Sequence, residues 1–94
     1  MNKQAKQKLK ADIQNAITNA IAAEAEYHAN QTSLDAAKAS YANAKDMYDL
    51  GAINTLEFTN TKTNMDTAEL NIIRAKYNYI FRMKIIDFYL GVSF

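Results

Sequence analysis

Apolar residues recur at helical spacing along the first half of the chain, in two rows. One row steps by seven residues and is mostly large: Ile13, Ala20, Tyr27, Leu34, Tyr41 and Tyr48. The other row, offset by three or four positions, is mostly alanine: Leu9, Ala16, Ala23, Asn30, Ala37 and Ala44. Two such rows form the a/d seam of a coiled coil, and large residues beside small ones favour close antiparallel packing. We therefore predict a helix over about residues 3–50, with Asn30 as a polar seam position of the kind that fixes register.

The second half of the chain repeats this arrangement and predicts a helix over about residues 55–90. Its large row is Phe58, Met65, Ile72, Tyr79 and Ile86, and its small row is Thr61, Ala68 and Ala75. A separate apolar set points away from these rows, so we expect this helix to have more than one partner; the set is Ile73, Ile80, Phe81 and Phe88. The early part is polar with few charges, which suits a wall facing a water-filled space: Asn60, Thr61, Thr63, Asn64, Thr67 and Asn71.

A single short interruption at residues 50–54 separates the two periodic segments. Gly51 is placed to end the first helix, because glycine takes positive φ without a Cβ clash. Asn54 and Glu57 match the capping box that starts a helix, and Ile53 and Phe58 match the flanking hydrophobic staple. So short a connection is typical of antiparallel neighbours. Together these features predict a rigid tip.

The chain is thus predicted to be all-α, a long antiparallel two-helix coiled-coil hairpin that forms a single domain of 94 residues. Proline, which would break either helix, is absent. Helices of about 40 residues, at about 1.5 Å per residue, would make the hairpin roughly 60–70 Å long. Leu90-Gly91 predicts a stop for the second helix. Two helices bury little core, so the six tyrosines and four phenylalanines indicate further neighbours.

Charge and cysteine content exclude several classes of function. The net charge of +1 gives no general attraction for nucleic acid, and we interpret the lysines that precede Asp12 as a solvated helix face. Cysteine is absent, which excludes disulfides and thiolate metal sites. No segment reaches the ~18 apolar residues of a membrane-spanning helix. No apolar stretch follows the basic residues 1–10, so we expect no export signal in the chain as given.

The residue pattern does not predict an enzyme. It contains no nucleophile with a paired base, no phosphate-binding loop and no paired carboxylates, and a hairpin offers no cleft of the usual ligand size. His28 lies four residues after Glu24, but the chain has no other histidine, so we expect a surface histidine and no metal site. Asn30-Gln31-Thr32 fits the glycosylation pattern, although Asn30 on the seam argues against that use. No cofactor is expected.

Several short patterns follow one another at regular spacing along the chain. They are Asp12-Ile13-Gln14-Asn15-Ala16, Tyr48-x-x-Gly51, the capped restart at Asn54–Glu57, Ala68-Glu69-Leu70-Asn71, Ala75-Lys76-Tyr77-Asn78-Tyr79 and Leu90-Gly91. In order and spacing they resemble the C-terminal periplasmic helical hairpin of TolC-type outer-membrane efflux proteins. The resemblance covers most of this chain but only the C-terminal part of a family member. It therefore implies that the chain is a fragment of a larger channel protein.

The resemblance also implies a place and partners for the hairpin. Three protomers of such a protein form a channel, and their helical hairpins build a tunnel in the periplasm. The turn lies at the inner end of that tunnel, where it meets a periplasmic adaptor (membrane fusion) protein that works with an inner-membrane pump. The chain would then be the periplasmic part of an outer-membrane protein, a homotrimer in the parent assembly. Neither a nucleic-acid partner nor a membrane-spanning segment of its own is expected.

Carried over by position, the resemblance makes Leu50-Gly51-Ala52 the adaptor-docking turn, and Tyr48 and Asp49 the gate candidates. Some family members have an arginine five residues after the tyrosine, where it ties the closed state. Ile53 occupies that position here, so we do not expect a gate held by arginine. Ile53 is better explained as part of the staple.

Two functional hypotheses stand side by side. In the first, the hairpin is a tunnel wall of an outer-membrane efflux or secretion channel, with its tip docked to an adaptor. In the second, it is a free-standing coiled-coil oligomerisation or protein-interaction module with no transport role. Gly51 would then be an ordinary helix stop, and Tyr48 a plain residue of the seam. A structure with Gly51 inside a continuous helix would contradict the first hypothesis.

Overall fold

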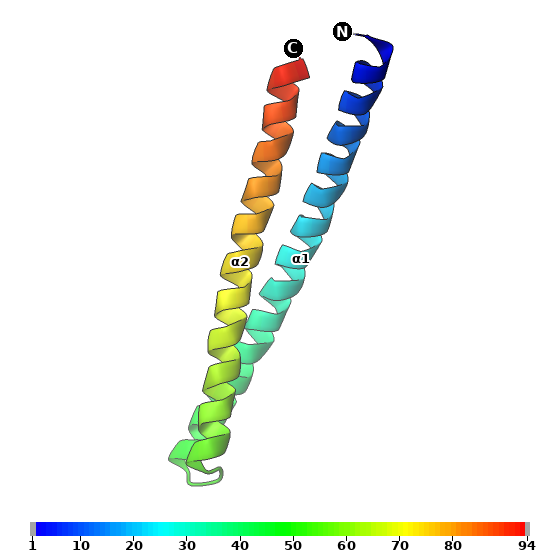
Figure 1. Ribbon diagram of the computed structural model, residues 1–94. Helices are drawn as coiled ribbons and strands as arrows, with labels where there is room; N and C mark the ends of the chain where they lie inside the picture. The colour runs from blue at the N-terminus through cyan, green and yellow to red at the C-terminus, as the bar shows by residue number, and fades with distance from the viewer. Residues whose placement is uncertain (1, 94) are drawn as a thin grey trace.

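Two long antiparallel helices make up the computed structural model, which describes residues 2–93 (Figure 1). Helix α1 spans Lys3–Asp49 and helix α2 spans Thr55–Ser93, joined by residues 50–54 at the end opposite both termini. The hairpin measures 72 × 16 × 15 Å, close to the length expected from helix rise alone. The predicted all-α, antiparallel two-helix hairpin is confirmed.

The seam between the helices is built from buried small residues, most of them alanines of α1, and from larger residues of both helices. The most buried side chains are Ala16, Ala20, Ala23, Leu34, Ala44 and Ala75, of which only Ala75 belongs to α2. The large row of α2, from Phe58 to Ile86, lies half-buried over them. Ring contacts cross the seam at Tyr27–Tyr79, with centroids 6.3 Å apart, and at Tyr41–Phe58, 5.6 Å apart. Small against large lets the two helices approach closely along most of their length.

Asn30 lies half-buried on the seam, as its row predicts, but it does not bond across it. Its Nδ2 donates to the backbone oxygen of Glu26 at 2.8 Å, one turn earlier in the same helix. The amide donor is therefore satisfied within α1. The packing of large residues on small residues therefore sets the register of the two helices, and this polar group does not.

The predicted helix stop at Gly91 is wrong. Helix α2 continues through Gly91 to Ser93, and Gly51 is the one glycine with positive φ. A glycine inside a helix costs only about 1 kcal/mol relative to alanine. That cost is small in a helix that is already many turns long, because helix formation is cooperative. A lone glycine therefore ends a helix only where it adopts the left-handed conformation itself and the capping bonds form.

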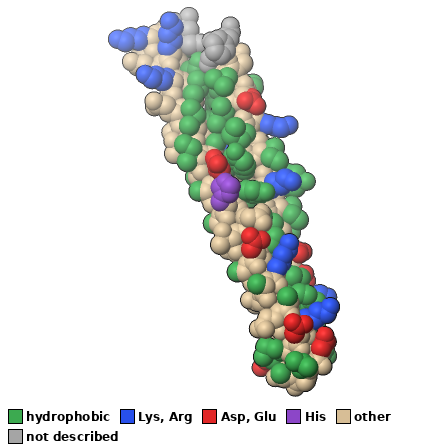
Figure 2. Space-filling model, turned by 180° about the vertical axis from the view of Figure 1, so that it is seen from behind, with side chains coloured by type: hydrophobic (Ala, Val, Ile, Leu, Met, Phe, Trp, Pro, Cys, Tyr) green, Lys and Arg blue, Asp and Glu red, His purple; other side chains and the backbone are tan. Residues whose placement is uncertain are grey.

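Much apolar surface stays exposed, most of it on α2. Ile73, Ile80, Phe81 and Phe88, which the periodicity places off the seam, are all exposed. Figure 2 shows hydrophobic side chains running along the half of the hairpin nearest the termini, and a smaller group beside acidic side chains at the tip. Both places lie on the outer surface of the hairpin and not in its seam.

Candidate functional site: the hairpin tip

Helix α1 ends in a Schellman motif centred on Gly51. The Gly51 N–H donates to the Tyr48 oxygen at 3.0 Å, and the Ala52 N–H donates to the Met47 oxygen at 2.7 Å. Gly51 has φ of +75°, in the left-handed region that this motif requires. An added Cβ on Gly51 would meet no atom within 4 Å, so glycine is required here by backbone conformation and not by lack of space.

Helix α2 begins with a cap from Asn54. Its Oδ1 accepts the Glu57 backbone N–H at 2.8 Å, and its backbone oxygen accepts the first helical bond, from Phe58, at 3.1 Å. The other half of the capping box, a bond from the Glu57 carboxylate back to Asn54, is not formed among residues 2–93. The carboxylate instead lies exposed in the first turn, where the helix dipole favours a negative charge.

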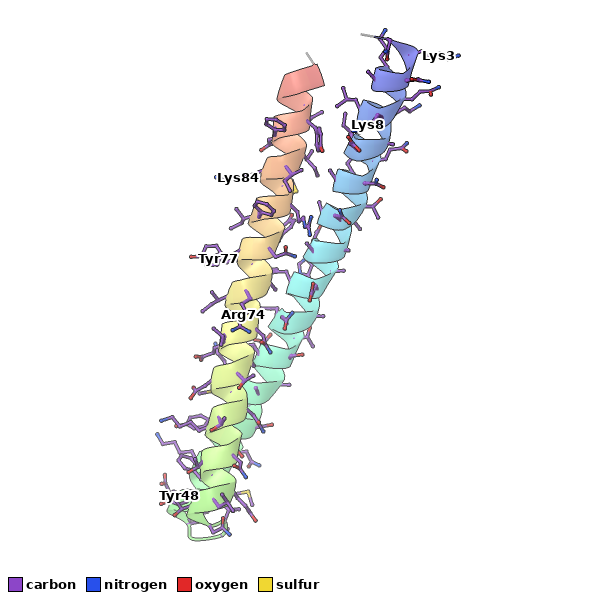
Figure 3. The ribbon with its side chains drawn as sticks, in the orientation of Figure 1. Lys3, Lys8, Tyr48, Arg74, Tyr77 and Lys84 are labelled. Atoms are coloured by element: carbon purple, nitrogen blue, oxygen red, sulfur yellow. The ribbon has the colours of Figure 1, made fainter. Side chains whose placement is uncertain are left out.

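Aromatic stacking joins the two helix ends across the turn. Tyr48 and Phe58 stack with centroids 4.7 Å apart and ring planes 16° from parallel. Tyr41 also contacts the Phe58 ring, with centroids 5.6 Å apart. The Tyr48 hydroxyl and Thr55 Oγ1 lie 3.4 Å apart, which adds a weak polar link at the outer edge (Figure 3). Tyr48 therefore braces the turn from the end of the seam.

Phe58 has aromatic partners in addition to the staple that the spacing predicts. The ring contacts of Phe58 are with Tyr48 and Tyr41, while Ile53 lies half-buried in the connection. A staple is a local motif read from spacing alone. The aromatic contacts depend on how α2 is rotated against α1, which is a tertiary property that the spacing does not contain.

Beyond the brace, the tip presents two leucines to solvent. Leu50 is 84% exposed and Leu56 is 68% exposed, one on each side of the turn. Gly51 and Ala52 lie exposed between them. Leu56 was not among the residues that the sequence reasoning selected. The available signal was a leucine in the first turn of the second helix that belongs to neither seam row.

The charges around these leucines are all acidic. Asp46, Asp49 and Glu57 lie exposed near the turn, and no lysine or arginine occurs from residue 46 to residue 57. Within the described part of the chain, none of the three carboxylates forms an ion pair. The tip is thus an apolar end flanked by exposed acidic side chains, with Lys45 directly before Asp46.

One side of the hairpin carries two shallow polar grooves away from the tip. The first, of about 400 Å³, is lined by Glu26, Asn30, Asn71, Arg74, Ala75 and Asn78. The second, of about 220 Å³ and nearer the termini, is lined by Asp12, Asn15, Ala16, Asn19, Arg82, Ile85 and Tyr89. Asn71, Asn78 and Ile85 are seven residues apart, so both grooves open on the same side. Both are open to solvent, which suits a water-facing wall better than a ligand site.

The polar stretch at the start of α2 is divided between several faces. Asn64 continues the row of Asn71 and Asn78 on the grooved side. Thr61 is half-buried in the seam, where its Oγ1 donates to the Glu57 oxygen at 3.0 Å. The six polar residues of this stretch therefore lie on more than one face of α2.

His28 lies on the exposed surface of α1, away from the tip. Its Nε2 is 3.6 Å from Glu24 Oε1, one turn earlier, with the histidine side chain 70% exposed. Within residues 2–93, no group of three or more histidine, aspartate or glutamate side chains is placed to hold a metal ion.

The described residues define a class of protein, the extended two-helix hairpins, here with an exposed tip and an exposed apolar face on α2. Comparison with known families narrows the class. The outer membrane efflux protein family matches residues 2–91, and because the match covers nearly the whole chain, the protein belongs to that family. No curated protein and no solved structure matches the chain.

The predicted relationship to TolC-type efflux proteins is confirmed by this family match. The chain is part of an outer-membrane efflux channel, which is a transport protein. In the described part of the chain, neither helix contains an apolar run sufficient to span a bilayer.

Proposed function

We propose that the hairpin lines the periplasmic tunnel of a trimeric outer-membrane efflux channel, and that its tip docks a periplasmic adaptor protein. The parent assembly would then include an inner-membrane pump. The family match supports the channel, and the rigid, exposed tip supports the docking role. The fragment character of the chain, as one hairpin of a longer channel protein, belongs to the same proposal.

The observation that carries the docking role is the preorganised turn. Two Schellman bonds, the Asn54 cap and the Tyr48–Phe58 stack hold the tip in one conformation without any partner. A surface that is already ordered loses little conformational entropy when it binds. Leu50 is an apolar side chain that remains exposed to solvent, so it is available to a partner.

The chemistry of the tip describes the partner surface. Leu50, Ala52 and Leu56 would form the apolar centre, with Asp46, Asp49 and Glu57 as a charged rim. Interfaces commonly have such an apolar centre and polar rim, and opposite charges across the rim speed encounter and set orientation. We expect the adaptor to present a small apolar hollow ringed by lysine or arginine.

Tyr48 and Asp49 are both proposed to lie at the gate, but their side chains differ in how free they are to move. Asp49 is exposed and carries a charge at the end of α1, so it can face the tunnel entrance. Tyr48 is committed to the stack with Phe58, so any gate movement of its ring must first break that contact. Ile53 supplies no cation to tie the closed state.

Leu50→Asp tests the docking role. Binding of the hairpin to the adaptor that the same genome encodes is measured by biolayer interferometry. We expect an affinity loss of at least about tenfold, the effect of losing roughly 1.4 kcal/mol from a central apolar anchor. Ile21→Asp is the matched control, because Ile21 is an exposed apolar residue far from the turn. Equal affinity of the Leu50 variant and the unmodified chain would contradict docking through this tip.

The alternative, a free-standing coiled-coil interaction module, has one observation in its favour. The exposed apolar face of α2 lies away from the tip and does not need an adaptor to be useful. If the unmodified hairpin self-associates but shows no adaptor binding in the same experiment, that alternative is supported over docking.

A further inference from the structure

The end of the hairpin opposite the tip carries a group of lysines that has no use within the chain. Four lysines precede the first acid of α1, and we name them the basic end: Lys3, Lys6, Lys8 and Lys10. All four are exposed, as expected for a solvated helix face, and within residues 2–93 none of them forms an ion pair. Figure 3 shows Lys3 and Lys8 near the N-terminus of α1, at the far end from Tyr48.

The chain as a whole is electrically asymmetric. Residues 3–22 and 82–93, which form the end that holds both termini, contain six lysine and arginine residues and two aspartates, a formal charge of +4. The rest of the chain contains five lysine and arginine residues and eight acids, a formal charge of −3. The small net charge of +1 thus conceals a separation of charge along a hairpin 72 Å long.

The position of these lysines opposes the electrostatics of their own helix. A helix N-terminus carries a partial positive charge, so acids are favoured in the first turn and lysines are not. Helix α2 follows this rule with Glu57, whereas the first turn of α1 has no acid and contains Lys3 and Lys6. Residues that break a local rule, with no compensating contact inside the chain, indicate a role outside it.

The four lysines surround α1 and do not form a stripe along it. Lys8 and Lys10 are two positions apart, so they point about 200° away from each other around the helix. What all four share is their level along the axis, since residues 3–10 span only about 10 Å. That distance is about one Debye length at 0.1 M salt. A flat anionic surface placed across this end would therefore attract all four lysines at once.

Exposed apolar side chains lie at the same end. Phe88 is 66% exposed and Phe81 is 59% exposed. Figure 2 shows basic side chains gathered beside the termini, with hydrophobic side chains continuing from them along the hairpin. Aromatic rings are favoured at the level of lipid headgroups, and lysines beside apolar residues are typical of peripheral binding to anionic bilayers.

We propose that the basic end binds the surface of a bilayer that carries anionic phosphate headgroups, with the hairpin standing up from that surface. A hairpin lying flat would bring the acids of residues 23–81 to the same surface, whereas a standing hairpin holds its acidic tip far beyond the screening length. The contact is peripheral, because neither helix of the described chain has an apolar run long enough to cross a bilayer. The proposal goes beyond the docking role and does not depend on it.

A nucleic acid is the main competing polyanion. Its phosphates form a long row, which suits cations clustered on one face or along a helix. Lysines that encircle one end, next to exposed apolar rings, suit a plane better than a row. We therefore favour the bilayer, and binding to nucleic acid becomes an outcome of the test.

Co-sedimentation of the chain with phosphatidylcholine vesicles, with and without phosphatidylglycerol, tests the contact. A lysine close to an anionic surface contributes roughly fivefold to binding. The double variant Lys3→Gln, Lys6→Gln should therefore lower the partition coefficient on anionic vesicles by about 25-fold. The matched control is Lys38→Gln, Lys45→Gln, which removes the same charge from exposed positions in the tip half of α1 and should change it by less than about twofold.

Folding does not confuse this comparison. Glutamine in place of lysine removes an unfavourable charge from the start of α1, so the first double variant should stay helical, as circular dichroism can check. Orientation is read with a fluorophore on a single introduced cysteine, because the chain has none of its own. A quencher on the lipid headgroups should quench the label at Gln7→Cys and leave the label at Thr59→Cys, beside the tip, unchanged.

Several results would overturn the proposal. Equal binding of the Lys3, Lys6 variant and the unmodified chain would remove the basic end, and equal quenching at positions 7 and 59 would remove the standing arrangement. Binding to a short DNA duplex as tight as to anionic vesicles would replace the bilayer with a general polyanion. Loss of vesicle binding with adaptor binding intact would refute the membrane contact alone, and the reverse result would refute the docking role alone.

Discussion

The tip and the arms of this hairpin differ in how far their side chains are packed and hydrogen-bonded within the chain itself. At the tip, backbone bonds, the Asn54 cap and a stacked ring pair come from residues close together in sequence, so the local structure is complete. In the half nearest the termini, α2 turns large apolar residues toward solvent. The tip is built to present a surface, whereas the arms are built to be covered.

This difference predicts which residues matter to the isolated chain and which matter only to its assembly. A side chain that braces or caps the turn should affect folding whether or not a partner is present. A side chain on the exposed apolar face of α2 should affect association while leaving the folding of the single hairpin nearly unchanged. Pairs of like residues, one from each region, test the distinction.

The largest effect on folding is expected from the phenylalanine pair. Phe58→Ala removes the ring that contacts both Tyr48 and Tyr41 and should lower the free energy of unfolding by about 2 kcal/mol. Phe81→Ala, on the exposed apolar face of α2, should change it by less than about 0.5 kcal/mol in dilute solution. Urea titration followed by circular dichroism measures both. Equal losses in the two variants would remove the distinction between tip and arms.

The two glycines give the next contrast, and here the signs are opposite. Gly51→Ala places a Cβ at φ of +75° and should cost about 1 kcal/mol. Gly91→Ala lies in a helix with open space around it and should stabilise by up to about 0.5 kcal/mol, since alanine has the higher helix propensity. The same titration reads both, and a stabilising Gly51→Ala would contradict the Schellman turn.

The smallest contrast lies between the two helix caps. Asn54 and Asn2 each accept a backbone N–H three residues on, at 2.8 and 2.7 Å. Asn54→Ala should cost about 1 kcal/mol because its helix start is held by the turn. Asn2→Ala should cost only a few tenths of that, about 0.3 kcal/mol, because a helix end at the terminus frays. A larger loss at Asn2 than at Asn54 would reverse the order of stability along the hairpin.

The seam and the turn could be predicted from sequence because each rests on a local signal. The seven-residue rows persist over many turns, so their periodicity identifies the faces that α1 and α2 present to each other. Gly51 is the only residue at the interruption that takes positive φ without strain, which located the end of α1. Both signals are properties of a few adjacent residues and need no knowledge of the partner helix.

The surface of the tip could be predicted only in part, for a tertiary reason. The choice of Tyr48 and Tyr41 as neighbours of Phe58 depends on the rotation of α2 about its axis after the turn. The same rotation leaves Leu56 exposed, and its absence from both seam rows was the one sequence signal for this. The predicted helix stop at Gly91 was wrong for a different reason. A glycine ends a helix only when a capping turn forms there.

The turn at residues 50–52 is closed by main-chain donors and acceptors alone. The side chains at positions 50 and 52 therefore have no part in holding it, and only Gly51 between them is constrained. The side chains of such a turn can change, and with them its binding partner, while its backbone conformation stays the same. New residues at these two positions would re-direct the hairpin to a different partner at almost no cost to folding, which makes the tip a natural place for related channels to diverge and for an engineer to re-target one.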